Sequence, residues 1–192
     1  MPGEAAASEA AEMPGLLSAG VQLGGQVRSL NSVTQTASLA EQWARRGVLF
    51  GSLDQLLPSH GDQIRPYLLS KAVDAGYDKF SALHAAFLTG GAVLFVPRGV
   101  VIDEPLHIHS MMSDGGVDFG HILVVLEDGA EATVLCETSS PEETSGGLHC
   151  GAVELLVGQG ANLRFVNLQD WGKRVWHFAH QKAVVQLSLI HI

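Results

Sequence analysis

The sequence is poor in aromatic residues, charged residues and cysteine. Aromatic side chains make up 6% and charged side chains 16% of the 192 residues, so a core must be built mainly from aliphatic side chains. Only two cysteines are present, Cys136 and Cys150, and their surroundings indicate neither a disulfide framework nor a zinc site. We therefore expect free thiols in a reducing cytoplasm.

Long apolar runs and an excess of basic residues are also missing. No run approaches the roughly eighteen apolar residues of a membrane span. The segment Met1–Gly15 is acidic and alanine-rich and lacks the basic start of a signal peptide. The formal charge of −9 disfavours nucleic acid and membrane surfaces, because phosphate binding requires a basic face. The sequence predicts a soluble, cytoplasmic protein that binds neither.

The first 90 residues divide into two predicted segments. Residues 1–37 are expected to be mostly disordered, because their beginning contains few branched apolar residues. Residues 38–90 are expected to form a helical region. The predicted helices are Ser38–Arg46 with Ser38 as N-cap, a turn over Ser52–Leu57 closed by Pro58, Ile64–Asp74, and Asp78–Thr89 before Gly90 and Gly91.

Residues 91–186 have the spacing of strands. The predicted strands are Ala92–Val96, Val100–Asp103, His121–Leu126, Glu131–Glu137, Gly151–Val157 and Asn162–Asn167. A pattern of strand, polar corner, glycine and strand occurs three times, and the aligned Gly99, Gly129 and Gly160 lie 30 and 31 residues apart. Stacked copies of such a unit cover each other's apolar face. We predict a mainly β fold, a right-handed parallel β-helix preceded by short α-helices; an antiparallel sandwich also fits the alternation alone.

Histidine is the most frequent side chain with potential chemistry in the β region. On a strand, His107 and His109 would share one face, and His121 begins a predicted strand, but no cysteine or carboxylate stands at ligand spacing. His177 and His180 are three residues apart, so a strand sends them to opposite faces. We predict that these histidines are structural and bind no metal.

The cysteines, carboxylates and tryptophans receive structural interpretations as well. Cys136 is predicted to be a small buried side chain, and the pair His149–Cys150 lacks the third group that would orient a nucleophile. Glu142 and Glu143 lie in a polar loop, where solvated charge is expected. For Trp171 and Trp176 we favour core and cross-strand packing over stacking on Lys173 or Arg174. No catalytic, cofactor-binding or metal-binding residue is assigned.

Several motifs resemble the SufB/SufD family of iron–sulfur cluster assembly proteins. Those that resemble the entry into that family's β-helix are Tyr77–Phe87 (YDKFSALHAAF), Gly90–Val100 (GGAVLFVPRGV) and Glu104–Leu106. Those that resemble its later rungs are Val124–Ala130 (VVLEDGA), Leu148–His149 and Asn167–Gly172 (NLQDWG). The resemblance extends from about Tyr77 to Gln186.

Within the family, the chain looks more like the SufD branch than the SufB branch. SufB members carry a Gln-Phe-Glu-Arg-like approach to the second rung and a Glu-Gly-Cys-Thr-Ala-Pro segment after it. The corresponding segments here are Asp118–His121 and Cys136–Pro141, which places Thr138 at the SufB cysteine position. Cys136 lies two residues away and does not inherit that role.

The resemblance implies a SufD-like scaffold subunit that pairs with SufB and with the ATPase SufC. SufC hydrolyses ATP, a nascent cluster forms at the SufB–SufD interface, and the SufD-like subunit performs no bond chemistry. The fragment itself is expected to bind no cofactor, and the iron–sulfur cluster is handled transiently by the intact complex. SufC docks on a C-terminal helical region that is not found here. The alternatives are a β-helix carbohydrate-active or acyl-transfer enzyme, or a non-catalytic binding module.

The last six residues, Leu187–Ile192, have a second interpretation. The sequence Leu-Ser-Leu-Ile-His-Ile is one reading frame of CTGTCTCTTATACACATC, a transposon-end sequencing adapter. The family continues into further rungs after Gln186. We therefore expect residues 187–192 to be an adapter artefact, and the β-helix of residues 91–186 to be a truncated copy.

Overall fold

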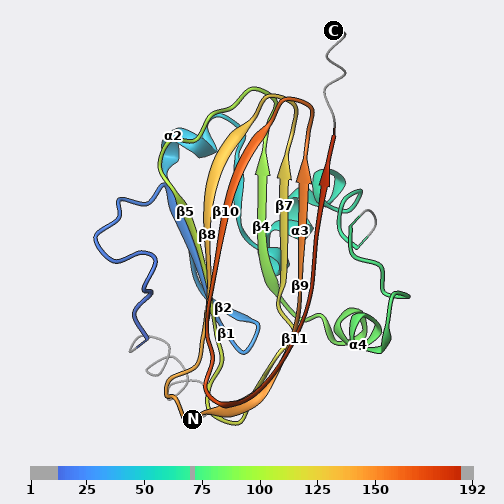
Figure 1. Cartoon of the computed structure of the whole chain (residues 1–192). Helices are drawn as coiled ribbons and strands as arrows, with labels where there is room; N and C mark the ends of the chain where they lie inside the picture. The colour runs from blue at the N-terminus through green and yellow to red at the C-terminus, as the bar shows by residue number, and fades with distance from the viewer. Residues whose placement is uncertain (1–12, 70–71, 187–192) are drawn as a thin grey trace, which may run out of the picture.

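The chain winds into a parallel β-solenoid of about three turns, which confirms the predicted fold class. The computed structural model describes residues 13–69 and 72–186. Two sheets face each other across the coil (Figure 1). One contains, in spatial order, β10 (Asn162–Asp170), β8 (Glu131–Ser139), β5 (Leu106–Met111), β1 (Gly25–Leu30) and β2 (Val33–Leu39). The other contains β11 (Arg174–Val185), β9 (Gly146–Val157), β7 (His121–Leu126), β4 (Gly91–Val96) and β3 (Leu49–Ser52).

Parallel pairing between successive turns sets the register of both sheets. The β1–β5–β8–β10 and β4–β7–β9–β11 neighbours are all parallel, and the short β6 (Gly116–Asp118) also pairs with β9. Antiparallel strands occur at the N-terminal edge, where β2 pairs with β1 and β3 with β4. Side chains of one turn therefore lie directly beside side chains about one repeat further along the chain.

The core lies between the two sheets. Leu94 on β4 and Val124 and Leu126 on β7 point inward and are buried. The residues between them, such as Val93 and Leu123, are buried too, because the helix α3 (Leu53–Ile64) and the residues after it cover the outer face. Burial on both faces explains why β4 and β7 are continuous apolar runs in the sequence.

Glycines in the left-handed conformation form the stacked corners. Gly99, Gly129 and Gly160 all have φ of 67°. The N–H of Gly99 donates to the carbonyl of Asp128 at 3.0 Å, and that of Gly129 donates to the carbonyl of Gln159 at 2.9 Å. The repeat recognised in the sequence is therefore a column of equivalent turns joined by hydrogen bonds from one turn of the solenoid to the next.

The helices are shorter and placed differently than the sequence predicts. The helix α2 (Glu41–Ala44) begins after Ala40, because Ser38 belongs to β2 and cannot cap it. Pro58 lies inside α3, which bends at His60 instead of ending. The helix α4 (Lys79–Phe87) lies within the predicted range Asp78–Thr89, and Asp78 caps its beginning. Across residues 13–69 and 72–186, none of the helices has the length and hydropathy needed to cross a bilayer.

Two other predicted elements are corrected. Ile64 ends α3, and the described residues after it form turns, so the predicted helix Ile64–Asp74 is wrong. The segment Val100–Asp103 contributes one isolated bridge, from Val101 to Glu131, and is not a regular strand. The strands β5 and β6 were not predicted, because histidines and glycine interrupt their apolar pattern.

The N-terminal segment also differs from the prediction. Disorder was expected over residues 1–37, but β1 pairs in parallel with β5 and is joined to β2 by a tight turn at Asn31 and Ser32. Val27 and Leu30 supply the apolar contacts that hold β1 in place. Residues 1–12 and the predicted adapter-derived residues 187–192 lie outside the described residues.

The corner conformation predicts the effect of substituting Gly129. A Cβ there would lie 3.9 Å from Cα of Gly99, so space is sufficient and the positive φ is the obstacle. We expect Gly129→Ala to lower the free energy of unfolding by about 1 to 2 kcal/mol in urea titrations. Gly51→Ala is the control, because its Cβ would make ordinary contacts with Leu56 without a positive φ. Equal losses in the two variants would contradict this explanation.

Candidate functional site

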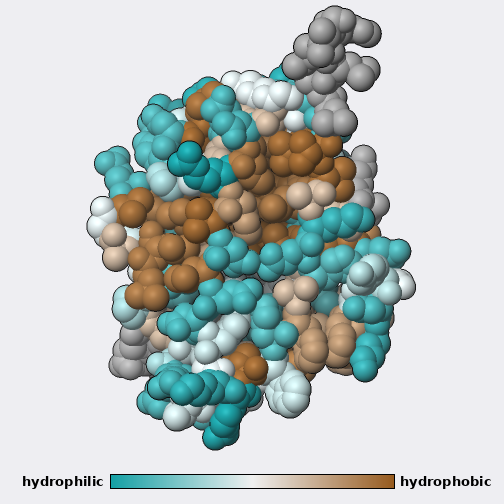
Figure 2. Space-filling model, in the orientation of Figure 1, coloured by the Kyte–Doolittle hydropathy of each residue, from teal (hydrophilic) through white to brown (hydrophobic). Residues whose placement is uncertain are grey.

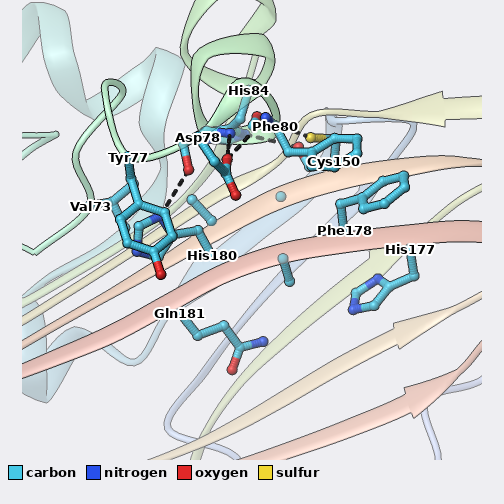
Figure 3. A pocket seen from close by; sticks show the side chains of 14 residues that line it. Val73, Tyr77, Asp78, Phe80, His84, Cys150, His177, Phe178, His180 and Gln181 are labelled. Carbon is cyan, nitrogen blue, oxygen red and sulfur yellow. Dashed lines mark hydrogen bonds between the residues drawn. The ribbon is translucent and has the colours of Figure 1, made fainter.

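A surface cavity lies between the start of α4 and the outer face of β9 and β11 (Figure 3). Asp78 fixes the beginning of α4, because its carboxylate accepts hydrogen bonds from the N–H groups of Phe80 and Ser81 at 3.0 and 2.7 Å. These bonds lower the pKa of the exposed Asp78, the one from the N–H of Ser81 most strongly. The cavity has a volume of about 450 Å³, enough for a side chain or a small ligand.

Aromatic contacts form the walls of this groove. Phe80 of α4 stacks on Phe178 of β11 with ring centroids 3.8 Å apart, and Tyr77 lies against His180 at 4.7 Å. The Ser81 hydroxyl and Nδ1 of His180 form a hydrogen bond of 3.0 Å. Phe178 and His180 alternate along β11 and face α4, whereas His177 faces the interior of the solenoid. The prediction that His177 and His180 point to opposite faces is confirmed.

Cys150 lies at the base of the groove but is not poised as a nucleophile. Its side chain is buried, and its Sγ donates to the carbonyl of Phe80 at 3.4 Å. Burial and the nearby charge of Asp78 raise the pKa of the Cys150 thiol. His149, the preceding residue in the sequence, points inward and does not activate it. A protonated, covered thiol is a poor nucleophile and a poor metal ligand.

Cys136 is still less accessible. It points into the apolar core from β8, and burial raises its pKa to about 12. The prediction of a small buried side chain is confirmed. Thr138 is also buried and donates its hydroxyl to the carbonyl of Leu168 at 3.4 Å.

The pair His107 and His109 meets a carboxylate that was not expected from the sequence. Glu137 lies 3.3 Å from Nε2 of His107 and 3.9 Å from Nε2 of His109, on the outer face of the first sheet. Burial would raise the pKa of Glu137, but hydrogen bonds from the N–H groups of Leu16 and Leu17 help to lower it. Glu137 thus binds the N-terminal segment over this face.

His121 belongs to a corresponding group on the second sheet. Its Nε2 lies 3.0 Å from the carboxylate of Glu154, and its Nδ1 lies 3.0 Å from Nε2 of His84 on α4. Glu154 also accepts hydrogen bonds from backbone N–H groups of residues 69, 72 and 73. Burial opposes ionisation, but the hydrogen bond with His121 and those from the N–H groups of Leu69 and Val73 lower the pKa of Glu154.

A third polar cluster lies inside the solenoid. The rings of His149, Trp171 and His177 contact one another, with centroids 4.6 to 5.9 Å apart. Asp118, whose pKa is raised by burial, lies 3.6 Å from Nε2 of His149. Packing is confirmed for Trp171, whereas Trp176 is 71% exposed, so the packing interpretation is wrong for Trp176.

The remaining carboxylate pair is solvent-exposed. Glu142 and Glu143 lie in the loop between β8 and β9, and Glu143 forms an ion pair with Lys173. In residues 13–69 and 72–186, His, Cys, Asp and Glu side chains nowhere form a group of three arranged to hold a metal ion. The two thiols, the luminal histidines and the surface carboxylates are therefore separate features.

Two carboxylates that organise these clusters were missed in the sequence. Glu137 follows His107 by 30 residues, which is one repeat, and this separation was the available signal. Glu154 interrupts the apolar run of β9, and a lone carboxylate in such a strand implies a buried partner. The partners themselves come from segments distant in the sequence, which periodicity does not connect.

Two family models match adjoining parts of the chain. The SufBD protein N-terminal region matches residues 26–108, and the SufBD core domain, described as SUF system FeS cluster assembly, matches residues 109–188. The match thus reaches further towards the N-terminus than the motifs that begin at Tyr77. It covers nearly all of β1 and the whole of β2, which lie mostly in the segment predicted to be disordered.

Similar curated proteins carry the same family description. Iron–sulfur cluster assembly SufBD family proteins from Staphylococcus haemolyticus and Staphylococcus epidermidis are 26% identical over 149 residues, covering 77% of this chain and 32% of each relative. One from Staphylococcus saprophyticus is 26% identical over 141 residues, covering 73% and 30%. The chain thus spans about a third of the length of these relatives.

The burial of Cys150 predicts slow reaction with thiol reagents. A stacked aromatic pair contributes about 1 kcal/mol beyond its buried area. We therefore expect Phe178→Ala, which removes the ring stacked on Phe80, to speed labelling of Cys150 about fivefold. Mass spectrometry after timed maleimide labelling measures both thiols, and Cys136 should be unchanged. Equal acceleration at both thiols would indicate global loosening and contradict this local role.

The luminal His149 predicts destabilisation by acid. Burial lowers its pKa to about 3, whereas an unfolded histidine titrates near 6.5. Between these values the unfolded state takes up a proton that the folded state refuses, so stability falls as the pH falls, by up to about 1.4 kcal/mol per pH unit. In urea titrations from pH 6.5 to 4.5, His149→Phe should show a shallower loss of stability than wild type. An unchanged slope would contradict this, and His60→Phe, at a half-buried position on α3, is the control.

Proposed function

This chain belongs to the SufB/SufD family, and from that premise we propose that it is part of a SufD-like scaffold subunit in iron–sulfur cluster assembly. The single observation that carries the proposal is that the segments matched by the two family models coincide with the β-solenoid. Two adjoining family matches run through one parallel β-solenoid, with the turn glycines stacked in register. The solenoid presents long, regular sheets on which a partner protein can pair. The proposed setting is the cytoplasm.

The environment of the thiols supports a role without bond chemistry in this part of the protein. Cys136 and Cys150 are both buried, and burial raises the pKa of each thiol. A ligand or sulfur acceptor needs an accessible thiolate. Thr138 occupies the position where the SufB branch has cysteine, and its hydroxyl faces a backbone carbonyl. These features favour the SufD branch over the SufB branch.

The proposed partners are SufB, through the β-solenoid, and the ATPase SufC, through the rest of the intact subunit. The iron–sulfur cluster is the cargo of the assembled complex. An acidic chain with a net charge of −9 is suited to protein partners more than to nucleic acid. The surroundings of the polar groups in the groove also favour a role without catalysis, because Ser81 is buried and its partner His180 lies against the ring of Tyr77.

Co-expression tests this proposal directly. We expect SufB to co-purify with the affinity-tagged chain and to stay bound through size-exclusion chromatography, because the proposed contact is formed by the solenoid. A tagged β-solenoid protein of another family, of similar size and charge, is the control. Failure to retain SufB would overturn the pairing. Turnover of a polysaccharide or an acyl donor by the purified chain would favour the enzyme alternative instead.

A further inference from the structure

A continuous hydrogen-bonded chain joins α4 to the solenoid through three buried side chains. Glu154 on β9, His121 on β7 and His84 on α4 are each at most 1% exposed. The bonds measure 3.0 Å from Glu154 to His121, 3.0 Å from His121 to His84, and 2.9 Å from Nδ1 of His84 to the carbonyl of Cys150. The two rings lie nearly in one plane, 24° apart, so their nitrogens meet edge to edge.

The number of protons in this chain follows from its geometry. A carbonyl only accepts, so Nδ1 of His84 must carry a proton and donate to Cys150. The contacts from His84 to His121 and from His121 to Glu154 each need a proton of their own. Three hydrogen bonds therefore require three protons. Two neutral histidines supply only two, so the network holds one additional proton.

The surroundings decide where the additional proton is. Three backbone N–H groups donate to the Glu154 oxygens, from Leu69 at 2.6 Å and from Ala72 and Val73 at 3.2 Å. These donors stabilise the carboxylate and leave little room for an acid proton. Burial lowers the pKa of His84 to about 4, so the proton is not held there. His121, between the two, remains.

We infer that His121 is a buried imidazolium paired with the Glu154 carboxylate, and that this one proton latches α4 onto the solenoid. Glu154 holds the segment before α4 through Leu69, Ala72 and Val73, and His121 holds α4 itself through His84. Loss of the proton leaves one of the three short contacts without a hydrogen. Two acceptors then face each other in a dry site, which favours release of α4.

Other ionisable groups surround the network without replacing its carboxylate. His180 of β11 and His149 of β9 lie near His84, and Asp78 lies near the Cys150 thiol. Among the described residues, Glu154 is the carboxylate hydrogen-bonded to His121. The latch also controls the groove, because α4 contributes Phe80 and Ser81 to its wall and covers Cys150.

Nuclear magnetic resonance of the histidine rings at pH 8 tests the assignment. We expect protons on both ring nitrogens of His121 and on Nδ1 alone of His84, with the signals assigned by single substitution. A bare nitrogen on His121 at this pH would overturn the inference. His60, whose Nδ1 is hydrogen-bonded to the hydroxyl of Ser59, provides a reference ring signal outside the network in the same sample.

A charge-neutral variant tests the latch. Glu154→Gln keeps the shape and lets an amide N–H donate to His121, so the three hydrogen bonds of this chain form with two neutral histidines. The variant loses the bond from the N–H of Leu69, which reaches the same oxygen as His121. We expect His121 to be neutral in this variant at pH 8. Glu137→Gln is the matched control, because it neutralises a buried carboxylate bonded to histidine on the other sheet and should leave His121 charged. If Glu154→Gln fails to fold, the wild-type ring spectrum still decides the assignment.

Hydrogen exchange measures whether α4 is released when His121 loses its proton. Raising the pH until the His121 signal loses its proton should release α4, with protection of the Ala82–Phe87 amides falling about tenfold per pH unit beyond the ordinary base catalysis. The amides of β7 should retain their protection. If α4 stays equally protected through the deprotonation of His121, the proton is not a latch.

Discussion

Parallel backbone pairing between successive turns is the constraint on which the rest of this structure depends. This pairing places each side chain beside the side chain at the equivalent position of the next turn. Every residue must therefore be compatible with its neighbours in the turns before and after it. Apolar residues satisfy this by stacking, as Leu94, Val124 and Leu155 do across β4, β7 and β9. The corner glycines satisfy it by repeating one backbone conformation. A buried polar side chain is compatible with its neighbours only when it has a hydrogen-bond partner. This requirement explains why the buried histidines and carboxylates occur in clusters.

Buried polar side chains on the outer faces of the two sheets are paired in the same way. Each face carries a buried carboxylate, Glu137 or Glu154, that hydrogen-bonds to histidine and to backbone N–H groups of a segment lying over the sheet. Covering segments have few strand partners of their own, so their backbone groups need acceptors. A carboxylate that supplies several acceptor positions meets this need at one point, and hydrogen bonding to histidine compensates part of the cost of burying it. These carboxylates thus attach separate segments to a regular solenoid.

The sequence contains enough information for the solenoid because its signals are periodic. The three glycines and the apolar runs of β4 and β7 each report a local conformation repeated at fixed spacing, and these predictions are confirmed. The strands β1 and β2 were missed because β1 is stabilised by pairing with β5, about 80 residues away, and not by its own composition. Glu137 and Glu154 were missed as organising residues for a similar reason, since their partners come from segments with no fixed spacing to them.

The positions of the thiols and of the charged side chains limit the chemistry that this solenoid can perform. Its thiols are buried, while the charged centres lie where segments attach to the sheets. Reactive sites require accessible groups with shifted pKa values in a cleft, whereas here the strongest shifts arise from burial within the fold. The buried carboxylates, and not the thiols, are therefore the charged points at which covering segments are held to the solenoid.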